Sequence, residues 1–384
     1  MRLLELVQSK AFAAALATSI VASPAVAAEM SFAVGFPDKQ TNTQAAHVMA
    51  KHIADNTDID VKVYPISLLS LAETSAGLRD GLADIGFVVT GYTPSDYSEM
   101  GLATNLALSA NSTGKQTQYP GAAMGLAVTE YVMLHCPECQ AEMKKMNQVY
   151  LGGGSSASYS IICADTEIES ADDLKGLKIR TAGPEYARWV ESFGAVNVKI
   201  PLGEVYEGFS QGVMDCMLNP PNSVEGSQLY DVIKQVYLGA PKGTYAAMTT
   251  GNVNLDAWKE LSVEEKSAFL RGAAEASAFT SWNYLNEGEV ALKKMEELNI
   301  TVKPVPADIV QTSADFAKSD IATVAELMKS QYNIDDVEKK MNTVVELVEK
   351  YKVLTEGKER DQAALAQLYW DNIMSKVDPA TYGN

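Results

Sequence analysis

The chain is poor in the residues on which most enzyme and metal chemistry depends. Its 384 residues include only three histidines: His47 and His52 fall in one predicted helix, and His135 lies in a distant part of the chain. Neither a nucleophile-elbow motif nor an H-E-x-x-H metal motif is present. The glycine run at residues 152–154 lacks the Gly-Lys-Ser/Thr ending of a phosphate-binding loop. The sequence therefore predicts no enzyme, no bound cofactor and no metal site.

Long apolar runs are absent after the first 28 residues. Arg2 and Lys10 precede an apolar run at residues 11–22, which is short for a membrane span. The small residues at 25–28 then offer a cleavage site for a signal peptidase. We therefore predict a signal peptide over residues 1–28 and an exported mature chain, with a retained membrane anchor as the weaker alternative.

Positive charge is scarce as well. Lysine and arginine total 31 against 49 acidic residues, which gives a formal net charge of −18. Such a surface repels nucleic acid and anionic lipid, so we expect neither as a partner. An anionic ligand would have to be captured by a local positive site, because the global field opposes its approach.

The four cysteines of an exported chain allow three disulfide connectivities. We favour the pairs Cys136–Cys139 and Cys163–Cys216. The first pair also has the spacing of a redox motif, and the adjacent His135 raises the possibility of a metal. However, no thioredoxin-like strand precedes this motif, and no fourth metal ligand lies nearby. A secreted thiol-disulfide protein that uses Cys136 and Cys139 remains an alternative from another class.

Short strands alternate with helices in two parts of the chain. In the first part the pattern predicts such elements at residues 30–34, 43–54, 60–65, 72–82 and 83–89. In the second part it predicts them at residues 159–163, 177–180, 185–193, 196–200, 204–211 and 215–218. This alternation is typical of parallel sheets covered by helices. We expect the glycine run at 152–154 to be a flexible link.

A much longer helical pattern follows the second part. Residues 262–298 contain no proline, and Ser262 with Glu265 forms a capping box at their start. Further helical patterns occupy residues 309–375. These last helices either pack on the rest of the chain or form a dimer contact, so both a monomer and a dimer are compatible with the sequence.

One short segment has the features of a ligand-binding strand end. Asp173 lies three residues after Ser170, as in a capping box, and Gly176 is expected in the left-handed conformation after the turn. Residues 177–180 alternate apolar and basic, which indicates a strand that ends at Arg180. Ligands bind outside the carboxyl ends of such strands, and a guanidinium matches a carboxylate with two parallel hydrogen bonds. The simpler alternative is a surface arginine.

The segment 173–180, followed in order by 203–206, 211–215 and 219–220, resembles the substrate-binding proteins of tripartite ATP-independent periplasmic (TRAP) transporters. Weaker similarity extends over residues 31–298. The resemblance implies an α/β, two-lobed periplasmic binding protein (type II-like) with a long helix spanning both lobes. It implies a periplasmic receptor that closes on a small organic acid and delivers it to the TRAP membrane permease subunits.

The resemblance also implies a division of the chain. The expected parts are a signal peptide (1–28), lobe I (29–157, with a return segment near 246–261), lobe II (158–245), a long inter-lobe helix (262–298) and a C-terminal helical segment (299–384).

Candidate site residues follow from the same resemblance. Arg180 matches the carboxylate-binding arginine of the family, and Asn219 matches its second polar contact, although Asn219 could instead cap a turn. Ser160 aligns with a place where many members carry a second basic residue, and Val89 and Leu202 align with places that are often polar or aromatic. The remaining candidates for substrate binding are Phe36, Thr90, Tyr92 and Met217.

A site with one strong cation and mostly apolar walls favours a monocarboxylate with an apolar or aromatic body. The alternative within the family is a C4-dicarboxylate or a sugar acid, if Lys178 or another polar residue replaces the missing second cation.

Overall fold

The computed structural model describes residues 28–108, 114–115 and 117–383. The predicted signal peptide, residues 1–28, lies outside the described residues apart from Ala28. Within the described ranges, no helix is both long enough and apolar enough to cross a membrane.

The first sheet has the strand order β2-β1-β3-β10-β4. Its strands are β1 (Ala28–Val34), β2 (Ile59–Pro65), β3 (Ile85–Gly86), β4 (Gln148–Val149) and β10 (Asn252–Asn254). β1 runs parallel to β2 and β3, as the alternating pattern predicts, whereas β10 is antiparallel to β3 and β4. The helices α1 (Thr41–Asn56) and α2 (Thr74–Arg79) connect the parallel strands. β3 is shorter than predicted, because the chain leaves the sheet after Gly86 and pairs again only at Val89, with Met248.

The second sheet has the order β11-β9-β5-β8-β6-β7. Its strands are β5 (Ser160–Cys163), β6 (Lys178–Arg180), β7 (Val196–Val198), β8 (Cys216–Asn219), β9 (Gln235–Leu238) and β11 (Thr301–Pro304). The connecting elements are η3 (Ala171–Leu174), α7 (Pro184–Ser192), η4 (Leu202–Glu204), α8 (Val205–Ser210) and α9 (Ser223–Gly226). The predicted capping box of Ser170 and Asp173 is present at η3, and Gly176 has the left-handed φ of 79°. β6 is parallel to both of its neighbours, so Arg180 ends a central strand.

Two crossing segments join the sheets, at residues 150–159 and 239–251. Hydrogen bonds hold them together, from Ser156 N to Tyr245 O (3.0 Å) and from Thr250 N to Gly152 O (2.9 Å). The expectation of a flexible glycine link is wrong, because the run is buried and tightly packed. A Cβ on Gly153 would lie 2.4 Å from Met248 O, and one on Gly154 would lie 2.6 Å from Thr280 Cβ. Glycine is therefore needed here for close approach.

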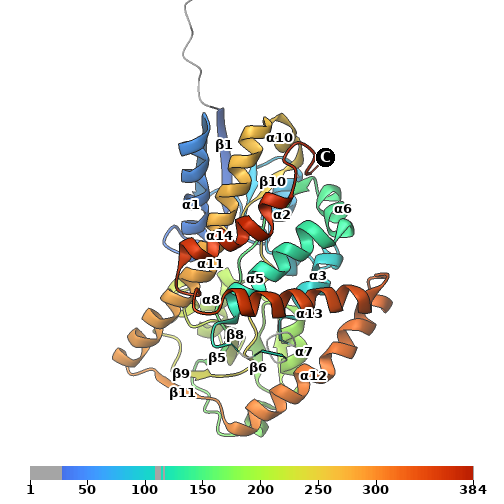
Figure 1. Cartoon of the computed structure of the whole chain (residues 1–384). Helices are drawn as coiled ribbons and strands as arrows, with labels where there is room; N and C mark the ends of the chain where they lie inside the picture. The colour runs from blue at the N-terminus through green and yellow to red at the C-terminus, as the bar shows by residue number, and fades with distance from the viewer. Residues whose placement is uncertain (1–27, 109–113, 116, 384) are drawn as a thin grey trace, which may run out of the picture.

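The long helix α11 (Val263–Glu297) follows α10 (Leu255–Glu260) and begins with the predicted Ser262–Glu265 capping box. Figure 1 shows α11 running from the first sheet, where it lies beside α1, toward β9 and β11 of the second sheet. The side chain of Glu287 reaches Thr41 on the first-sheet side and Asn222 on the second-sheet side. α11 thus contacts both lobes.

The C-terminal helices α12 (Ala307–Ser330), α13 (Val337–Leu354) and α14 (Gln362–Asn372) pack on the same chain, before the short turn η5 (Met374–Lys376). Arg188 of α7 binds both carboxylate oxygens of Asp320 at 2.7 and 2.8 Å. The same guanidinium donates to Asn105 Oδ1 at 2.8 Å. α13 crosses the first lobe in Figure 1, and Tyr369 of α14 donates to Gly153 O at 3.0 Å.

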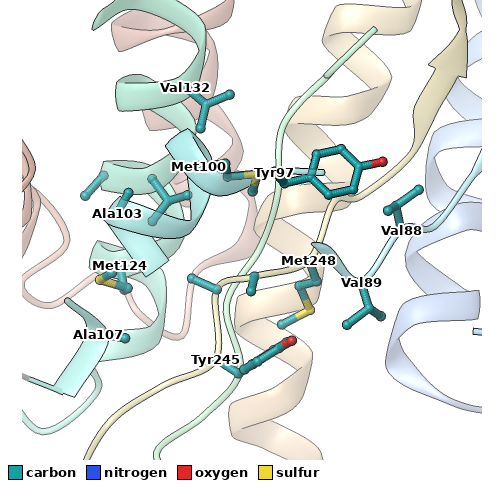
Figure 2. Close-up of a cluster of buried hydrophobic side chains, with 14 of the residues drawn as sticks. Val88, Val89, Tyr97, Met100, Ala103, Ala107, Met124, Val132, Tyr245 and Met248 are labelled. Atoms are coloured by element: carbon teal, nitrogen blue, oxygen red, sulfur yellow. The ribbon is translucent and has the colours of Figure 1, made fainter. Parts of the chain in front are cut away.

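The core of the first lobe extends from its helices to the crossing segments. It involves η1 (Thr90–Tyr92), α3 (Ser98–Asn105), α5 (Pro120–Glu130), the π-helical turn η2 (Tyr131–His135) and α6 (Pro137–Lys145). In Figure 2, Met100, Met124 and Val132 lie on the helical side of this cluster, and Val89 and Met248 lie together on the other side. Removing such buried apolar groups from water stabilises the fold by about 25 cal/mol per Å².

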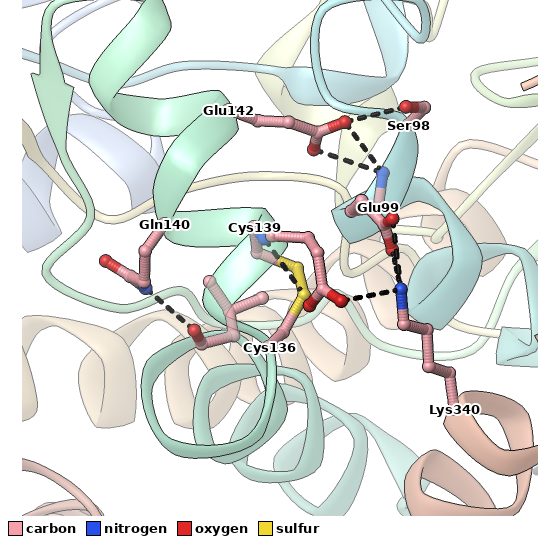
Figure 3. The surroundings of a disulfide bond; sticks show 9 residues. Ser98, Glu99, Cys136, Cys139, Gln140, Glu142 and Lys340 are labelled. Atoms are coloured by element: carbon pink, nitrogen blue, oxygen red, sulfur yellow. Dashed lines mark hydrogen bonds and ion pairs between the residues drawn. A yellow bond between two sulfur atoms is a disulfide. The ribbon is translucent and has the colours of Figure 1, made fainter. Parts of the chain in front are cut away.

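Both favoured disulfides are present in the structure. Cys163 and Cys216 are paired residues of the antiparallel strands β5 and β8, so this bond links neighbouring strands of the second sheet. Cys136 and Cys139 form a local bond at the start of α6. Figure 3 shows that this local bond lies beside Lys340 of α13, which contacts Glu99 at 2.9 Å. The local disulfide therefore lies where the C-terminal helices contact the first lobe.

Candidate functional site

A cavity of about 520 Å³ lies between the two sheets. The carboxyl ends of β1 and β3 face it from one side, and those of β6 and β8 face it from the other, while α11 forms a further wall. Its lining includes Phe36, Asn42, Phe87, Val89, Tyr92, Tyr159, Arg180, Leu202, Asn219, Asn222, Tyr245, Met248, Tyr284 and Glu287.

Arg180 is the buried cation of this cavity, with 1% of its surface exposed. Its Nε donates to Ile200 O at 3.0 Å, and its Nη1 donates to Asn219 Oδ1 at 3.2 Å. Both partners are neutral, and among the described residues no carboxylate forms an ion pair with it. A buried charge without a counter-ion is costly, so this guanidinium is prepared for an external anion.

Asn219 complements Arg180. Its side chain is 3% exposed, and its Oδ1 accepts the hydrogen bond from Arg180. Since the oxygen is engaged in this way, the Nδ2 group is oriented as a free donor, and no described residue accepts from it. Two donors from neighbouring strands thus converge, which suits the two oxygens of a carboxylate.

Apolar and aromatic side chains make up much of the remaining wall. Phe36 and Phe87 meet edge to face with ring centroids 5.5 Å apart. Tyr159 and Tyr245 lie on the crossing segments with ring centroids 6.3 Å apart, and burial raises the pKa of each phenol well above its usual range. These rings therefore stay neutral and provide flat faces against which an apolar or aromatic ligand body can pack.

Two hydrogen bonds connect the lobes across the cavity. Tyr92, which follows β3 of the first sheet, accepts a hydrogen bond from Leu202 N of the second lobe at 3.2 Å. Gln40, just before α1, donates to Gly226 O at the end of α9. These contacts link the two lobes on either side of the cavity.

A carboxylate lies in the wall formed by α11. Glu287 accepts hydrogen bonds from Thr41, from Asn283 at 2.9 Å and from Asn222 at 3.3 Å. Burial raises the pKa of Glu287 above its usual range, while these three hydrogen bonds act in the opposite direction. Within the described part of the chain, no group of three or more His, Cys, Asp and Glu side chains has the arrangement of a metal site.

Six of the nine residues predicted for substrate binding line the cavity, namely Arg180, Asn219, Tyr92, Phe36, Leu202 and Val89. The structure does not bring the other three there. Ser160 lies opposite Asn219 in the β5–β8 ladder and is buried at the edge of a different cavity. Met217 is on the same face of β8 as Asn219 but lies two residues farther from the carboxyl end of the strand, and it packs into the core of the second lobe. Thr90 is the first residue of η1, the turn that also contains Tyr92, and its side chain is buried.

Several residues that line the cavity are not among those predicted from the sequence. Tyr159 lies at the end of a crossing segment, one residue before β5, so the prediction of Ser160 misses this lining residue by one position. Tyr245, Tyr284 and Glu287 reach the cavity from a crossing segment and from α11. A polar residue in a long helix is usually solvated, so only the helix's path between the lobes reveals the position of Glu287.

Comparisons with known proteins agree with this architecture. Residues 32–327 match the family described as bacterial extracellular solute-binding protein, family 7 (DctP). The ectoine-binding periplasmic protein TeaA of Halomonas elongata is 33% identical over 118 residues, 30% of this chain and 33% of TeaA. The 2,3-diketo-L-gulonate-binding periplasmic protein YiaO of Escherichia coli is 22% identical over 325 residues, 81% of this chain and 93% of YiaO.

A solved structure of a marine metagenome TRAP solute-binding protein, in complex with 3-hydroxybenzoate, has the same fold. Its TM-score is 0.72 at 21% identity, and the match covers 84% of this chain and 98% of that one. The predicted two-lobed α/β fold with a long helix is therefore confirmed. Because the family match covers most of the sequence, the chain belongs to the bacterial extracellular solute-binding protein family 7, the periplasmic solute receptors of TRAP transporters.

Proposed function

We propose that this receptor binds a monocarboxylate with an apolar or aromatic body and delivers it to TRAP membrane permease subunits. The observation that carries the proposal is the buried Arg180, which has neutral partners only and lines a cavity with aromatic walls. Burying one aromatic ring contributes a few kcal/mol to binding, at ~25 cal/mol per Å² of apolar area. The metagenome relative, described as specific for aromatic acid ligands, supports the same ligand class.

A dicarboxylate or sugar acid is the alternative within the family. A second carboxylate would need a second cation, and Lys39 is the other lysine or arginine among the described lining residues. Lys39 is exposed, so its charge is screened by solvent. The site therefore favours one buried carboxylate over two.

A thiol-disulfide function has less support. Cys136 and Cys139 are bonded to one another and are only 2% and 0% exposed, so neither sulfur is presented to a partner. We accordingly expect the protein to bind and release its ligand without chemical change.

The test is calorimetric titration of the mature protein, refolded from denaturant to remove carried-over ligand. The panel contains aliphatic, aromatic and 2-oxo monocarboxylates, dicarboxylates and sugar acids, each titrated into the wild type and Arg180→Ala. We expect a monocarboxylate to bind most tightly and to lose about thirtyfold or more in affinity with Arg180→Ala, since truncating one partner of a buried charge pair costs about 2–5 kcal/mol.

Two results would contradict the proposal. If a dicarboxylate bound most tightly, the ligand class would be wrong. If Arg180→Ala bound every acid as well as the wild type, the assignment of the carboxylate site to Arg180 would fail.

A further inference from the structure

The wall of the cavity holds a carboxylate without a cationic partner, which the binding of a simple monocarboxylate does not use. Glu287 lies in the second half of α11, and its hydrogen-bond partners Thr41, Asn222 and Asn283 are all uncharged. No described lysine or arginine forms an ion pair with it. An anion in the wall of an acid-binding cavity would repel a purely anionic ligand, so its presence calls for a ligand with a compensating group.

Two buried oxygen atoms beside Glu287 also lack donors. Asn42 and Asn222 are 2% and 8% exposed and line the same cavity. Asn222 Nδ2 donates to Glu287, and Asn42 Nδ2 donates to Tyr284 OH at 3.0 Å, so both amides use their nitrogen within the protein. Their Oδ1 atoms accept no hydrogen bond from any described residue. A buried acceptor without a donor costs about 1–3 kcal/mol. The two oxygen atoms have almost no accessible surface, so a ligand donor would recover this cost once the side chains, which line the cavity, turn their oxygens toward it.

The Glu287 carboxylate and the two amide oxygens are three acceptors with no cation among their described partners. One kind of ligand group matches all three. An ammonium group carries one positive charge and three N–H donors, one for the carboxylate and one for each amide oxygen. A neutral hydroxyl offers one donor and no charge, so it would leave two of the three acceptors unpaired. On this basis we propose that the ligand is a zwitterion, with its ammonium group bound by Glu287, Asn42 and Asn222 and its carboxylate bound by Arg180.

The two charged residues belong to different walls of the cavity. Arg180 ends β6 of the second sheet, whereas Glu287 belongs to α11, and the two side chains form no ion pair with each other. The carboxylate and the ammonium group of the ligand would therefore be bound by different walls, and ω-amino acids are the ligands with which we test this arrangement. This inference rests on the proposed function, because it takes Arg180 as the carboxylate site.

Matched ligand pairs test the proposal by calorimetry on the refolded mature protein. The first pair is 4-(aminomethyl)benzoate and 4-methylbenzoate, and the second is 6-aminohexanoate and hexanoate. Each pair is titrated into the wild type, Glu287→Gln and Glu289→Gln. Glu287→Gln removes the charge but keeps the size of the side chain and one oxygen as an acceptor. Glu289→Gln removes the same charge from α11 outside this cavity, where Glu289 pairs with Arg360.

We expect the amine of each pair to bind about tenfold or more tightly than its amine-free partner in the wild type and in Glu289→Gln. In Glu287→Gln the two ligands of each pair should bind with about equal affinity, because the charge that selects the ammonium group has been removed. Melting temperatures of the three proteins verify that each variant is folded.

Three results would overturn the assignment. The amine-free acids could bind as tightly as the amines in the wild type, or the preference for amines could persist in Glu287→Gln. In a third arm, sodium replaces potassium in the buffer. If sodium strengthened binding of the amine-free acids only when Glu287 is present, the site would hold a metal cation instead of an ammonium group. Failure of the proposed function is distinguishable, since then no acid of either kind would depend on Arg180.

Discussion

The two sheet walls of the cavity bury different kinds of side chain. The second sheet contributes Arg180 and Asn219, a charge and an amide at the ends of neighbouring parallel strands. The first sheet contributes Phe36, Phe87 and Val89, which are apolar. Under the proposed function, the second-sheet wall binds the carboxylate and the first-sheet wall recognises the shape of the ligand body. A ligand would then contact both walls at once, because both line the same cavity.

The difference extends beyond the cavity. The second lobe also buries Glu185, which begins α7 and is 2% exposed, and it carries the disulfide that joins β5 to β8. Buried charges without counter-ions reduce stability, and a cross-strand disulfide increases it. The first lobe instead has a local disulfide at the start of α6, and the largest apolar core extends from this lobe into the second. Four predictions test this contrast, and the largest effect is expected at the charged wall.

Asn219→Asp should have the largest effect. The variant keeps the shape and the acceptor for Arg180 Nη1, but it supplies an internal carboxylate that pairs with the cation and repels the ligand. We expect calorimetry to show a loss of affinity of about a hundredfold or more, because like charges in a buried site cost several kcal/mol.

The ligand-free Asn219→Asp protein should at the same time melt at a higher temperature than the wild type, since Arg180 then has a counter-ion. Loss of binding with a lower melting temperature would instead indicate a damaged fold, and unchanged binding would contradict the role of this wall.

The second-largest effect is expected from the disulfides, which should differ in how much each stabilises the folded protein. Cys163 and Cys216 are 53 residues apart in sequence, whereas Cys136 and Cys139 are 3 apart. In the chain-entropy model, double alanine replacement of the first pair costs about 4 kcal/mol of unfolding free energy, and replacement of the second costs less than about 2 kcal/mol. Urea unfolding under oxidising conditions measures both. All four cysteines are buried, so lost packing is matched, and equal losses would contradict the expectation.

Glu185→Gln tests the uncompensated buried charge in the second lobe. Burial raises the pKa of Glu185 from 4.5 to about 7, so the folded protein holds a proton here that the unfolded chain releases at lower pH. The wild type should therefore lose stability as the pH rises from 4.5 to 7, by up to about 3 kcal/mol. The glutamine variant has no such loss.

The measurement for Glu185→Gln is thermal unfolding of both proteins at about pH 5 and about pH 8, below and above the raised pKa. The variant should be clearly more stable than the wild type at the higher pH and nearly equal to it at the lower pH. The same difference at both values would show that the carboxyl group does not titrate in this range.

Phe87→Leu at the apolar wall should have the smallest effect. It removes the edge-to-face contact with Phe36 and one flat surface of the cavity. We expect the ratio of the dissociation constants of hexanoate and benzoate to fall by about fivefold, which corresponds to about 1 kcal/mol. Phe193→Leu, which packs on Trp189 in the second lobe, is the matched control and should leave the ratio unchanged. An equal change in both variants would contradict the role of Phe87.

Much of the carboxylate wall could be predicted because its determinants are local. The capping box at Ser170, the left-handed Gly176 and the alternating strand all lie within the segment 170–180, and each depends on backbone preferences that a sequence displays. The parallel strands of the first lobe and the start of α11 followed from the same kind of signal.

The remainder depends on contacts that no local pattern encodes. Tyr159 ends a crossing segment and Ser160 begins β5, so an error of one residue exchanges a cavity residue for a buried ladder residue. The glycine run has the composition of a flexible link, but its lack of side chains serves close packing against α11 and Met248. Glu287 is a cavity residue only because α11 passes between the lobes.

The placement of Arg180 on a strand and Glu287 on a helix has a consequence for how such receptors diversify. If the two proposals hold, a substitution in α11 can change which second group of the ligand is accepted while Arg180 of β6 and Asn219 of β8 continue to bind the carboxylate. The two determinants of selectivity can thus evolve independently. Single substitutions in α11 can change the ligand of such a receptor, and every intermediate form still binds an acid.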